Sequence, residues 1–475
     1  MSRFPRSTPE AQGIASQSVS ALVSTLESQN AHIHSFMLLR HGHLIAEGWW
    51  HPYCREDTHS LYSLTKSFTS TAIGLLISSG RLSLDDTILS IFPEDAPPNP
   101  SPNLQAMAVR HLLSMSNGHD TEVQDEMLAE HGNVIRAFLA HPVPHQPGTH
   151  FLYNSIASHI LSEIVRKLTG EHLVDFLRPR LFEPLGITHY YWETRPFTTT
   201  TGGWGLHLTT ADIAAFGQLY LNKGLWNGQQ LIPAAWVELA TSFKVSNGSN
   251  PDSDWEQGYC YQFWRCRHNM YRGDGAFGQY CVVMPEYDAV LAVNAGLGDM
   301  QLPLNAVWEQ LLPAMQPAPL PEDPAAQSAL AAQTAQLALP TIAGTKTTAL
   351  AQQVFGRRYT VTEGMDGITA VQFDSHAEQT TLTLYKADDQ IALSFGHGAW
   401  QYSEAAFHPR DVAVNGLVAE KSGIWQIAAS GAWTDEHTYT AKLWWIETPF
   451  AWTFTCHFEG SKLTIEQCMN VGFEA

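Results

Sequence analysis

The feature that most constrains the fold is a change of composition between about residues 316 and 350. This stretch is rich in Ala, Pro and Gln and is typical of a linker, although its Pro-flanked middle can form one helix. Before it, helix-like and strand-like segments mix. After it, residues 351–475 consist of short runs in which apolar and polar side chains alternate. The sequence therefore predicts two folded units, residues 1–315 and an antiparallel β-barrel or sandwich over residues 351–475.

The composition excludes several classes of function. Of 475 residues, 44% are hydrophobic and only 15% are charged, so most of the chain can bury a core. The net charge of −20 repels phosphate backbones and anionic lipid, so we expect neither nucleic acid nor a membrane as partner. The sequence shows no secretory signal, no apolar run long enough to cross a membrane and no C-x-x-C pair among its six cysteines. These features predict reduced thiols and a cytoplasmic location.

The stretch "SLTKSFTSTAIGLL" places a serine and a lysine, Ser63 and Lys66, at the start of a predicted helix over residues 63–80. Positions i and i+3 share one helix face, about 5–6 Å apart at Cβ. A lysine whose pKa is lowered by burial can take the serine proton, and the free Ser63 N–H can form half of an oxyanion hole. The alternative is that Ser63 caps the helix and Lys66 is a solvated charge. The four residues alone do not decide between the two.

Two further segments carry groups suited to the same chemistry. In "YNS", the Tyr153 phenol can exchange a proton with a lysine, and the Ser155 hydroxyl can relay a proton or orient the lysine. In "RGDGAFGQY" (272–280), glycines allow the backbone to approach a ligand closely, and the strand that follows can present an N–H. Each segment has a plain alternative: a core tyrosine at the start of a helix over residues 151–170, and a hairpin turn.

In their order and separations, these motifs resemble those of the serine β-lactamase and penicillin-binding-protein superfamily: S-x-x-K, then Y-x-S about 90 residues later, then a K-T-G-like strand. Phrases such as "GRLSLDDTILSIFPE", "VRHLLSMSNGHD" and "GGWGLHLTTADIAAFGQLYLNKGLWNGQQLIP" extend the resemblance over about residues 5–300. The nearest branch contains class C-like β-lactamases, D-stereospecific peptidases and family VIII carboxylesterases. The resemblance implies an α/β (α+β) fold in which an antiparallel sheet carries helices, with a helical subdomain inserted around residues 80–200.

The resemblance also assigns roles to the first two motifs. Ser63 would be the acylated nucleophile, and Lys66 and Tyr153 the proton-transfer pair. Ser155 takes the third position of the Y-x-S motif. The predicted reaction is two-step acyl transfer through a covalent intermediate on Ser63.

The third motif departs from the family pattern. The K-T-G triad falls on Ala276, Phe277 and Gly278, which would contact substrate, and Gln279 would supply the second oxyanion N–H from an edge strand that begins there. A lysine in place of Ala276 would attract a substrate carboxylate. Its absence argues against β-lactam and carboxypeptidase substrates and towards a neutral ester or amide, unless an arginine such as Arg272 supplies the charge.

The sequence thus predicts a serine hydrolase of a small-molecule or short-peptide substrate, with a D-amino-acid peptidase or β-lactamase as alternatives. An inactive binding module on the same fold is the non-enzyme alternative, and assembly into a homo-oligomer is left open. We expect no cofactor and no metal, because His41 and His43 lack an evident third ligand and no nucleotide-binding glycine motif occurs. The aromatic stretch "KLWWIETPFAWTF" (442–454) predicts either a domain core and interface or a wall of the substrate cleft.

Overall fold

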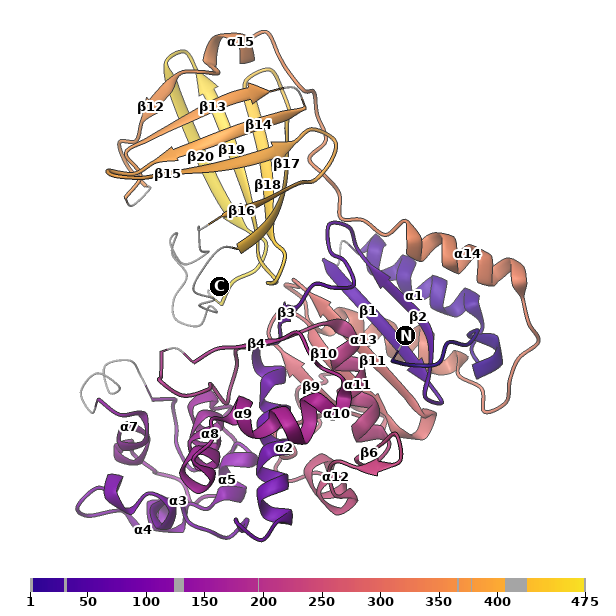
Figure 1. The fold of residues 1–475 in the computed structure, drawn as a ribbon, viewed down its shortest axis with the longest axis vertical. Coiled ribbons are helices and arrows are strands. Elements are labelled where there is room, and N and C mark those ends of the chain that lie inside the picture. The colour runs from indigo at the N-terminus through magenta and orange to yellow at the C-terminus, as the bar shows by residue number, and fades with distance from the viewer. Residues whose placement is uncertain are drawn as a thin grey trace.

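The computed structural model (Figure 1) has an N-terminal unit built on a six-stranded sheet and a C-terminal unit built on a nine-stranded sheet. It describes residues 3–29, 32–123, 132–194, 196–364, 367–376, 378–405 and 425–473. The mixed helical and antiparallel fold class that the sequence predicts is confirmed. Within the described residues, no helix is both long enough and apolar enough to cross a bilayer.

The six-stranded sheet is antiparallel throughout, in the order β2-β1-β11-β10-β9-β8. Its strands are β1 (Ile33–Arg40), β2 (His43–Trp49), β8 (Trp264–Arg265), β9 (Tyr271–Gly275), β10 (Gln279–Met284) and β11 (Ala289–Ala295). His41 and Gly42 adopt positive φ in the turn between β1 and β2, and a single turn at Pro285 joins β10 to β11. Every residue of β1, β10 and β11 is buried, which requires cover on both faces.

Helices provide that cover on each side of the sheet. On one face lie α2 (Thr65–Ser78) and α11 (Thr210–Leu221), and on the other lie α1 (Ser16–Ser28) and α13 (Gln301–Ala306). The alternation within β1 shows the division: Met37 and Leu39 join the core with α2 and α11, whereas Phe36 and Leu38 join the core with α1. Successive side chains of a strand point to opposite faces, so a continuous apolar run is what a doubly covered strand needs.

The helical part of the N-terminal unit lies between α2 and the small strand β4. Its helices are α3 (Ile88–Ile91), α4 (Pro102–Ala106), α5 (Val109–Leu113), α7 (Val134–Ala140), α8 (Ser155–Thr169), α9 (Leu173–Leu177) and α10 (Glu183–Leu185). The longest of them, α8, begins where the Asn154 side chain accepts the Ala157 N–H at 2.8 Å, and it ends at Gly170 with φ +76°. A polar cap and a left-handed glycine are the ordinary helix limits, and this glycine stop was predicted.

A three-stranded sheet links this helical part to the segment that precedes Ser63. Its strands are β3 (His59–Ser60), β4 (Tyr191–Trp192) and β5 (Leu206–Leu208), in the order β3-β5-β4. The remaining small elements of the N-terminal unit are β6 (Leu225–Trp226), β7 (Gln229–Gln230) and α12 (Ala234–Thr241).

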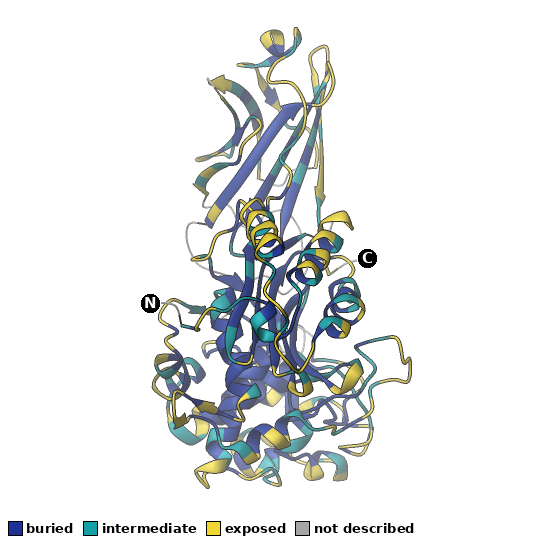
Figure 2. Ribbon diagram, turned by 90° about the vertical axis from the view of Figure 1, so that its right-hand side faces the viewer, coloured by how far each residue is buried: buried dark blue, intermediate teal, exposed yellow. Residues whose placement is uncertain are grey.

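The second sheet curls into a nearly closed barrel, which settles the predicted choice between barrel and sandwich. Its strands are β12 (Arg358–Thr360), β13 (Ala370–His376), β14 (Gln379–Tyr385), β15 (Gln390–Gly396), β16 (Gln401–Ala405), β17 (Trp425–Trp433), β18 (Thr438–Trp445), β19 (Ala451–Glu459) and β20 (Lys462–Met469). Alternation along the strands brings Trp433, Trp445 and Trp452 into the interior, each at most 1% exposed. Figure 2 shows the buried residues along these long strands and through the central sheet.

The segment predicted as a linker is in part a packed helix. Residues Pro324–Ala335 form α14, whose first turn is capped by the Asp323 carboxylate accepting the Ala326 N–H at 3.0 Å. Leu330 is buried, and α14 lies against α1 and β2. Because its apolar side chains are few, the packing against α1 rather than periodicity decides its place. The short helix α15 (Ala351–Val354) then leads into the barrel.

The barrel docks on the N-terminal unit through the turn between β18 and β19. The Glu447 carbonyl oxygen accepts the Ser60 N–H at 2.9 Å, and the Asn470 amide donates to the Gly296 carbonyl oxygen at 3.3 Å. A Cβ on Gly296 would lie 2.3 Å from the Pro449 carbonyl oxygen, so only glycine permits this approach. The two units are therefore joined by backbone contacts next to β3.

Two buried histidines lie at the same junction. His34 stacks on Tyr53 with ring centroids 3.9 Å apart and meets Trp444 of the barrel edge-on. His59 Nδ1 lies 3.1 Å from the Ser60 carbonyl oxygen and so carries the proton, which leaves Nε2 to accept from His34 Nδ1 at 3.0 Å. Burial lowers the pKa of His34 well below 6.5 and that of His59 to about 3. Both rings are neutral in the folded protein at ordinary pH.

This pair predicts a loss of stability on acidification. The unfolded chain binds a proton on each histidine below pH 6.5, whereas the folded chain does not until far lower pH. Stability therefore falls as pH decreases from 6.5 towards the folded pKa, by about 2 kcal/mol per histidine at pH 5. Urea unfolding of the wild type and of His59→Gln at pH 7.5 and 5.0 should show a smaller pH dependence in the variant. The control is exposed His41→Gln. An equal pH dependence in the wild type and H59Q would contradict the prediction.

Candidate functional site

Ser63 lies in a tight turn at the entrance of α2. A short 3₁₀ helix, η2 (Tyr62–Leu64), precedes α2, and Tyr62 enters it with φ +46°. Neither the start of η2 nor that of α2 carries a side-chain cap. The Ser63 hydroxyl instead accepts a hydrogen bond from Lys66 Nζ at 2.9 Å. The cap-and-solvated-charge alternative is wrong, because Lys66 is 1% exposed.

The Lys66 amine is held by three oxygen atoms. Besides Ser63 Oγ, its Nζ lies 3.2 Å from Ser155 Oγ and 2.8 Å from the Gly203 carbonyl oxygen. Burial lowers the pKa of Lys66 to about 7, against the opposing effect of the Glu122 and Asp274 carboxylates. A large fraction of the amine is thus unprotonated at neutral pH, and it lies within reach of the serine proton.

Gly203 is a site residue that the sequence did not single out. A Cβ on Gly203 would lie 2.6 Å from the Ser155 carbonyl oxygen, and one on Gly202 would lie 2.3 Å from that of Ser158. These two glycines let their segment press on α8, which brings the Gly203 carbonyl to Lys66. The signal was present in the phrase "GGWG", but its partner helix is visible only in the fold.

Tyr153 lies next to both Ser63 and Lys66. Its hydroxyl is hydrogen-bonded to Ser63, and its ring faces Lys66 Nζ, which lies 4.8 Å from the ring centroid. The ring stacks on Trp264 at 5.2 Å. Burial raises the pKa of Tyr153 well above 10, although the hydrogen bond to Ser63 acts in the opposite direction. The phenol therefore keeps its proton, and of the predicted pair only Lys66 can serve as a base near pH 7.

Ser155 is the first residue of α8, and its backbone N–H donates to the Glu122 carboxylate. An acidic side chain at a helix N-terminus is favoured by the helix dipole. The negative charge of Glu122 also raises the pKa of Lys66. Glu122, like Gly203, is therefore a residue of the site that was not predicted from the sequence. No local pattern marks it, because 33 residues separate it from Ser155.

The strand that lies against the serine turn is β9, and this corrects one prediction. An edge strand was predicted to begin at Gln279, but β10, which begins there, lies inside the sheet between β9 and β11. A Cβ on Gly275 would lie 2.0 Å from the Leu61 carbonyl oxygen, and one on Gly273 would lie 2.2 Å from the Leu64 side chain. The glycines of "RGDG" therefore serve the close contact between β9 and the turn that carries Ser63.

The predicted substrate-contacting residues form the turn between β9 and β10. Ala276, Phe277 and Gly278 connect the two strands, and the last two have φ of +65° and +96°. Gln279 opens β10 opposite Gly275 in the ladder. The amide of its buried side chain donates to the Ala276 carbonyl oxygen at 3.1 Å and to the Ala295 carbonyl oxygen of β11 at 2.7 Å. The side chain therefore links the β9–β10 turn to β11.

Arg272 does not supply a free positive charge. It is 0% exposed, and its guanidinium donates to Asp274 at 2.7 Å and to the Asp254 carbonyl oxygen at 2.8 Å. Cys266 Sγ is a third contact at 3.2 Å. The hypothesis that Arg272 replaces the family's lysine is thus not supported. The carboxylate of Asp274, which acts on the pKa of Lys66, instead disfavours an anionic group nearby.

Within the described part of the chain, one group of three metal-binding side chains lies together: Asp120, His145 and His150, with ligand atoms within 4.8 Å of one another. The two imidazoles stack with centroids 4.1 Å apart and planes 26° apart. A metal ion lies in the plane of an imidazole that binds it, so two stacked, nearly parallel rings cannot bind one ion without turning. As arranged, the group does not form a metal site.

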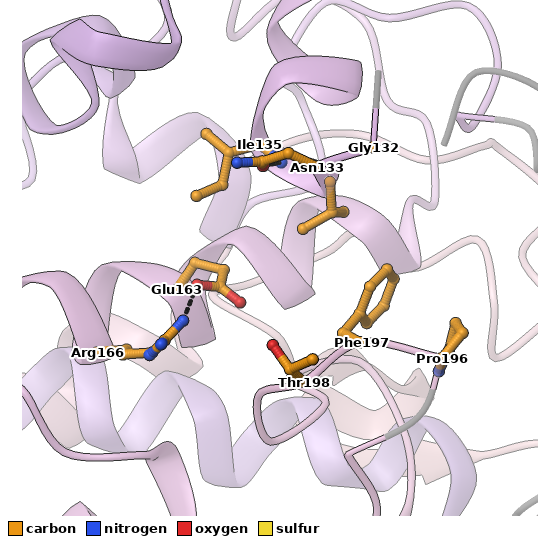
Figure 3. Close-up of a pocket in the computed structure, with 9 residues that line it drawn as sticks. Gly132, Asn133, Ile135, Glu163, Arg166, Pro196, Phe197 and Thr198 are labelled. Carbon is orange, nitrogen blue, oxygen red and sulfur yellow. Dashed lines mark hydrogen bonds and ion pairs between the residues drawn. The ribbon is translucent and has the colours of Figure 1, made fainter. Parts of the chain in front are cut away.

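Figure 3 shows a cleft of about 440 Å³ on the helical part of the N-terminal unit. It lies between the start of α7, the middle of α8 and residues 196–198, and an ion pair within α8, between Glu163 and Arg166 at 3.8 Å, forms part of its wall. None of the residues predicted for acyl transfer lines it. This hollow is separate from the Ser63 turn.

The antiparallel sheet, the inserted helices and the serine–lysine contact are features of the superfamily that the sequence resembles. The chain belongs to the beta-lactamase family, whose model matches residues 21–298. A lovastatin esterase from Penicillium rubens is 28% identical over 169 residues, which cover 30% of this chain and 42% of that protein. The chain thus matches less than half of the esterase.

Two further likenesses cover more of the chain. A 6-aminohexanoate-dimer hydrolase from Paenarthrobacter ureafaciens is 24% identical over 54% of this chain and 71% of that protein. The structure of an octameric penicillin-binding protein homologue from Pyrococcus abyssi covers 96% of this chain and 99% of that one, with a TM-score of 0.50 and 14% identity. This likeness concerns the fold alone, and it extends over both units.

The contact between β9 and the serine turn predicts a sensitive position. Gly275→Ala would force a Cβ against a backbone carbonyl, which cannot turn aside as a side chain can. We expect a loss of about 1–3 kcal/mol in the free energy of unfolding, measured by urea unfolding. Gly298→Ala is the matched control, since no atom lies within 4 Å of its added Cβ. Equal stability of both variants would show that β9 does not press on the turn.

Proposed function

We propose that the protein is a serine hydrolase that cleaves esters of uncharged acyl groups through an acyl-enzyme on Ser63. The observation that supports the proposal most directly is the 2.9 Å contact between Ser63 Oγ and a buried Lys66 amine with a pKa of about 7. A serine is a weak nucleophile unless an adjacent base removes its proton. Membership of the beta-lactamase family supports hydrolase chemistry in general.

The first half-reaction begins with the neutral Lys66 amine. It takes the Ser63 hydroxyl proton as Oγ attacks the substrate carbonyl carbon, and the carbonyl oxygen becomes negatively charged. The Ser63 N–H and a second N–H from the β9–β10 hairpin, for which the sequence predicts Gln279, stabilise that oxyanion. The proton on Lys66 then passes to the departing alkoxide, directly or through the Tyr153 hydroxyl, and the acyl group remains on Ser63.

The second half-reaction repeats these steps with water. Lys66, neutral again, takes a proton from water, and the hydroxide attacks the acyl carbon. The proton returns to Ser63 Oγ as the acid leaves. Ser155 positions the lysine throughout through its 3.2 Å contact with Nζ. No metal or cofactor is required by this sequence of steps.

The charges around the site support a neutral acyl group. Arg272 is engaged by Asp274, and Ala276 is the residue predicted at the position of the family's lysine. A substrate carboxylate would find no free cation there, which disfavours β-lactam and carboxypeptidase substrates. Amides are the second candidate class, favoured by the likeness to the 6-aminohexanoate-dimer hydrolase over 71% of that protein. An inactive binding module is the remaining alternative.

The direct test is hydrolysis of p-nitrophenyl acetate. We expect turnover by the wild type, and a loss of at least about a thousandfold in kcat in both Ser63→Ala and Lys66→Ala. Ser78→Ala, at the far end of the same helix, is the matched serine control and should keep full activity. Activity retained in Ser63→Ala would assign the chemistry to another residue. Absence of turnover by the wild type on esters and amides would favour the binding module.

The pH dependence of kcat/KM tests which residue is the base. Because the base must be unprotonated, activity should rise about tenfold per pH unit below pH 7 and level off above it. Tyr153→Phe should lower the plateau and leave this limb in place, since the phenol keeps its proton over the whole range. A limb that disappears in Tyr153→Phe would identify the tyrosine as the base instead.

A further inference from the structure

Four aromatic rings from both units meet beside Ser63. Tyr62, the residue before the serine, contacts Phe277 edge-on with centroids 5.6 Å apart, and Phe450 at 6.4 Å. Phe473 completes the group, 4.8 Å from Phe277 and 5.8 Å from Tyr62. Two rings thus come from the N-terminal unit and two from the barrel, and we call these four residues the aromatic cluster.

Hydrogen bonds hold the segment that follows β20 against this cluster. Asn470, the residue after β20, accepts the Ala451 N–H at 2.6 Å and donates to the Pro449 carbonyl oxygen at 2.9 Å. Its amide also reaches the Gly296 carbonyl oxygen at 3.3 Å. Leu297, the residue after Gly296, donates its N–H to the Phe277 carbonyl oxygen at 2.9 Å. The turn that carries Phe277 and the segment that carries Phe473 are therefore anchored to the same short stretch.

Three rings of the aromatic cluster are buried, and the fourth, Phe473, has an exposed face. Phe450 is 0% exposed, and Tyr62 and Phe277 are 6% and 7% exposed. Phe473 is 46% exposed, although it packs on two of these rings. The three buried rings suffice to join the barrel to the serine turn, so the exposed ring face of Phe473 is not needed for that junction.

The position of this open face relates it to the reacting atoms. Phe277 lies in the hairpin turn between Gly275, which touches the serine turn, and Gln279, the predicted oxyanion donor. A carbonyl bound between Ser63 and this hairpin has its acyl carbon chain on the side of the hairpin turn or on the side of Lys66 and Tyr153. The second side is occupied by the Lys66 amine and the Tyr153 phenol, both of which are polar. The apolar side is that of the aromatic cluster.

We propose that Phe473, with Phe277 behind it, forms an apolar wall that binds the acyl chain of the substrate, so that the barrel selects medium-chain or aryl acyl esters over acetyl esters. The proposal rests on the proposed function. It assigns the C-terminal unit a part in substrate choice, because the wall forms only when the segment that carries Phe473 lies on the β9–β10 turn. Phe473 is here a specificity-determining residue and takes no part in proton transfer.

The test compares the wild type, Phe473→Ala and Phe473→Leu on p-nitrophenyl acetate and octanoate. We expect Phe473→Ala to lower the ratio of kcat/KM for octanoate to that for acetate by about tenfold, through the KM for octanoate. Phe473→Leu should restore most of the ratio, since a leucine still offers apolar surface. Leu225→Ala, which removes another exposed apolar side chain, is the control and should leave the ratio unchanged. An unchanged ratio in Phe473→Ala would overturn the proposal.

A second readout separates failure of this proposal from failure of the proposed function. Ethyl and octyl fluorophosphonates bond covalently to an activated serine with release of fluoride, and the labelled residue is identified by mass spectrometry. Faster labelling of Ser63 by the octyl reagent in the wild type, lost in Phe473→Ala, supports the wall. Equal rates with both reagents overturn the wall and leave the hydrolase standing. No labelling of Ser63 by either reagent overturns both.

Discussion

The exclusion of water from the Lys66 amine is the constraint on which the rest of the site depends. A lysine side chain is normally charged and solvated, and burial without a counter-ion in direct contact favours the neutral amine. Here the amine lies within hydrogen-bond distance of two hydroxyls and a backbone carbonyl; the charged form can donate to all three, whereas the neutral form keeps two N–H donors and has a lone pair that can accept a proton. The Glu122 and Asp274 carboxylates moderate the shift, and the resulting pKa of about 7 suits a base that must gain and lose a proton near neutral pH.

Close backbone approaches, made possible by glycine, assemble the oxygen atoms around that amine. Gly203 presses on α8, Gly275 presses on the segment before Ser63, and Gly296 admits the β18–β19 turn of the barrel. At each place an added Cβ would lie under 3 Å from a carbonyl oxygen. The contact at Gly275 is made with the segment that leads into the Ser63 turn, whereas Gly203 contacts α8 and Gly296 contacts the barrel. Of the three, the contact at Gly275 holds the serine turn directly, and the other two hold the parts around it.

The barrel is attached where the chemistry is proposed to occur. Its turn bonds to Ser60, three residues before the proposed nucleophile, and Phe450 packs on Tyr62, the residue directly before it. The aromatic stretch 442–454 therefore has the first of the two roles predicted for it, that of domain core and interface: Trp445 and Trp452 fill the barrel core, and Phe450 packs on Tyr62 at the interface. A domain added on the far side of the sheet would have had no such effect on the serine turn.

Local patterns in the sequence determined a large part of this protein. The alternation within the barrel strands, the end of α8 at Gly170 and the spacing of Ser63 and Lys66 depend on neighbours a few residues apart, and such short-range rules predict well. The same rules left open whether Ser63 was a cap, because a serine at a helix start suits both roles until the surroundings of Lys66 are known.

Only the tertiary structure decided which distant groups meet at that turn. Glu122 and Gly203 reach the site from loops far away in sequence, and β9 rather than β10 lies against the turn. Arg272 is neutralised by a residue two positions along its own strand, a pairing that alternation permits but does not require. Periodicity specifies which face of an element is buried; it does not specify the partner. The charge around Lys66, and with it the pKa of its amine, is a sum over those partners and is therefore set by the fold.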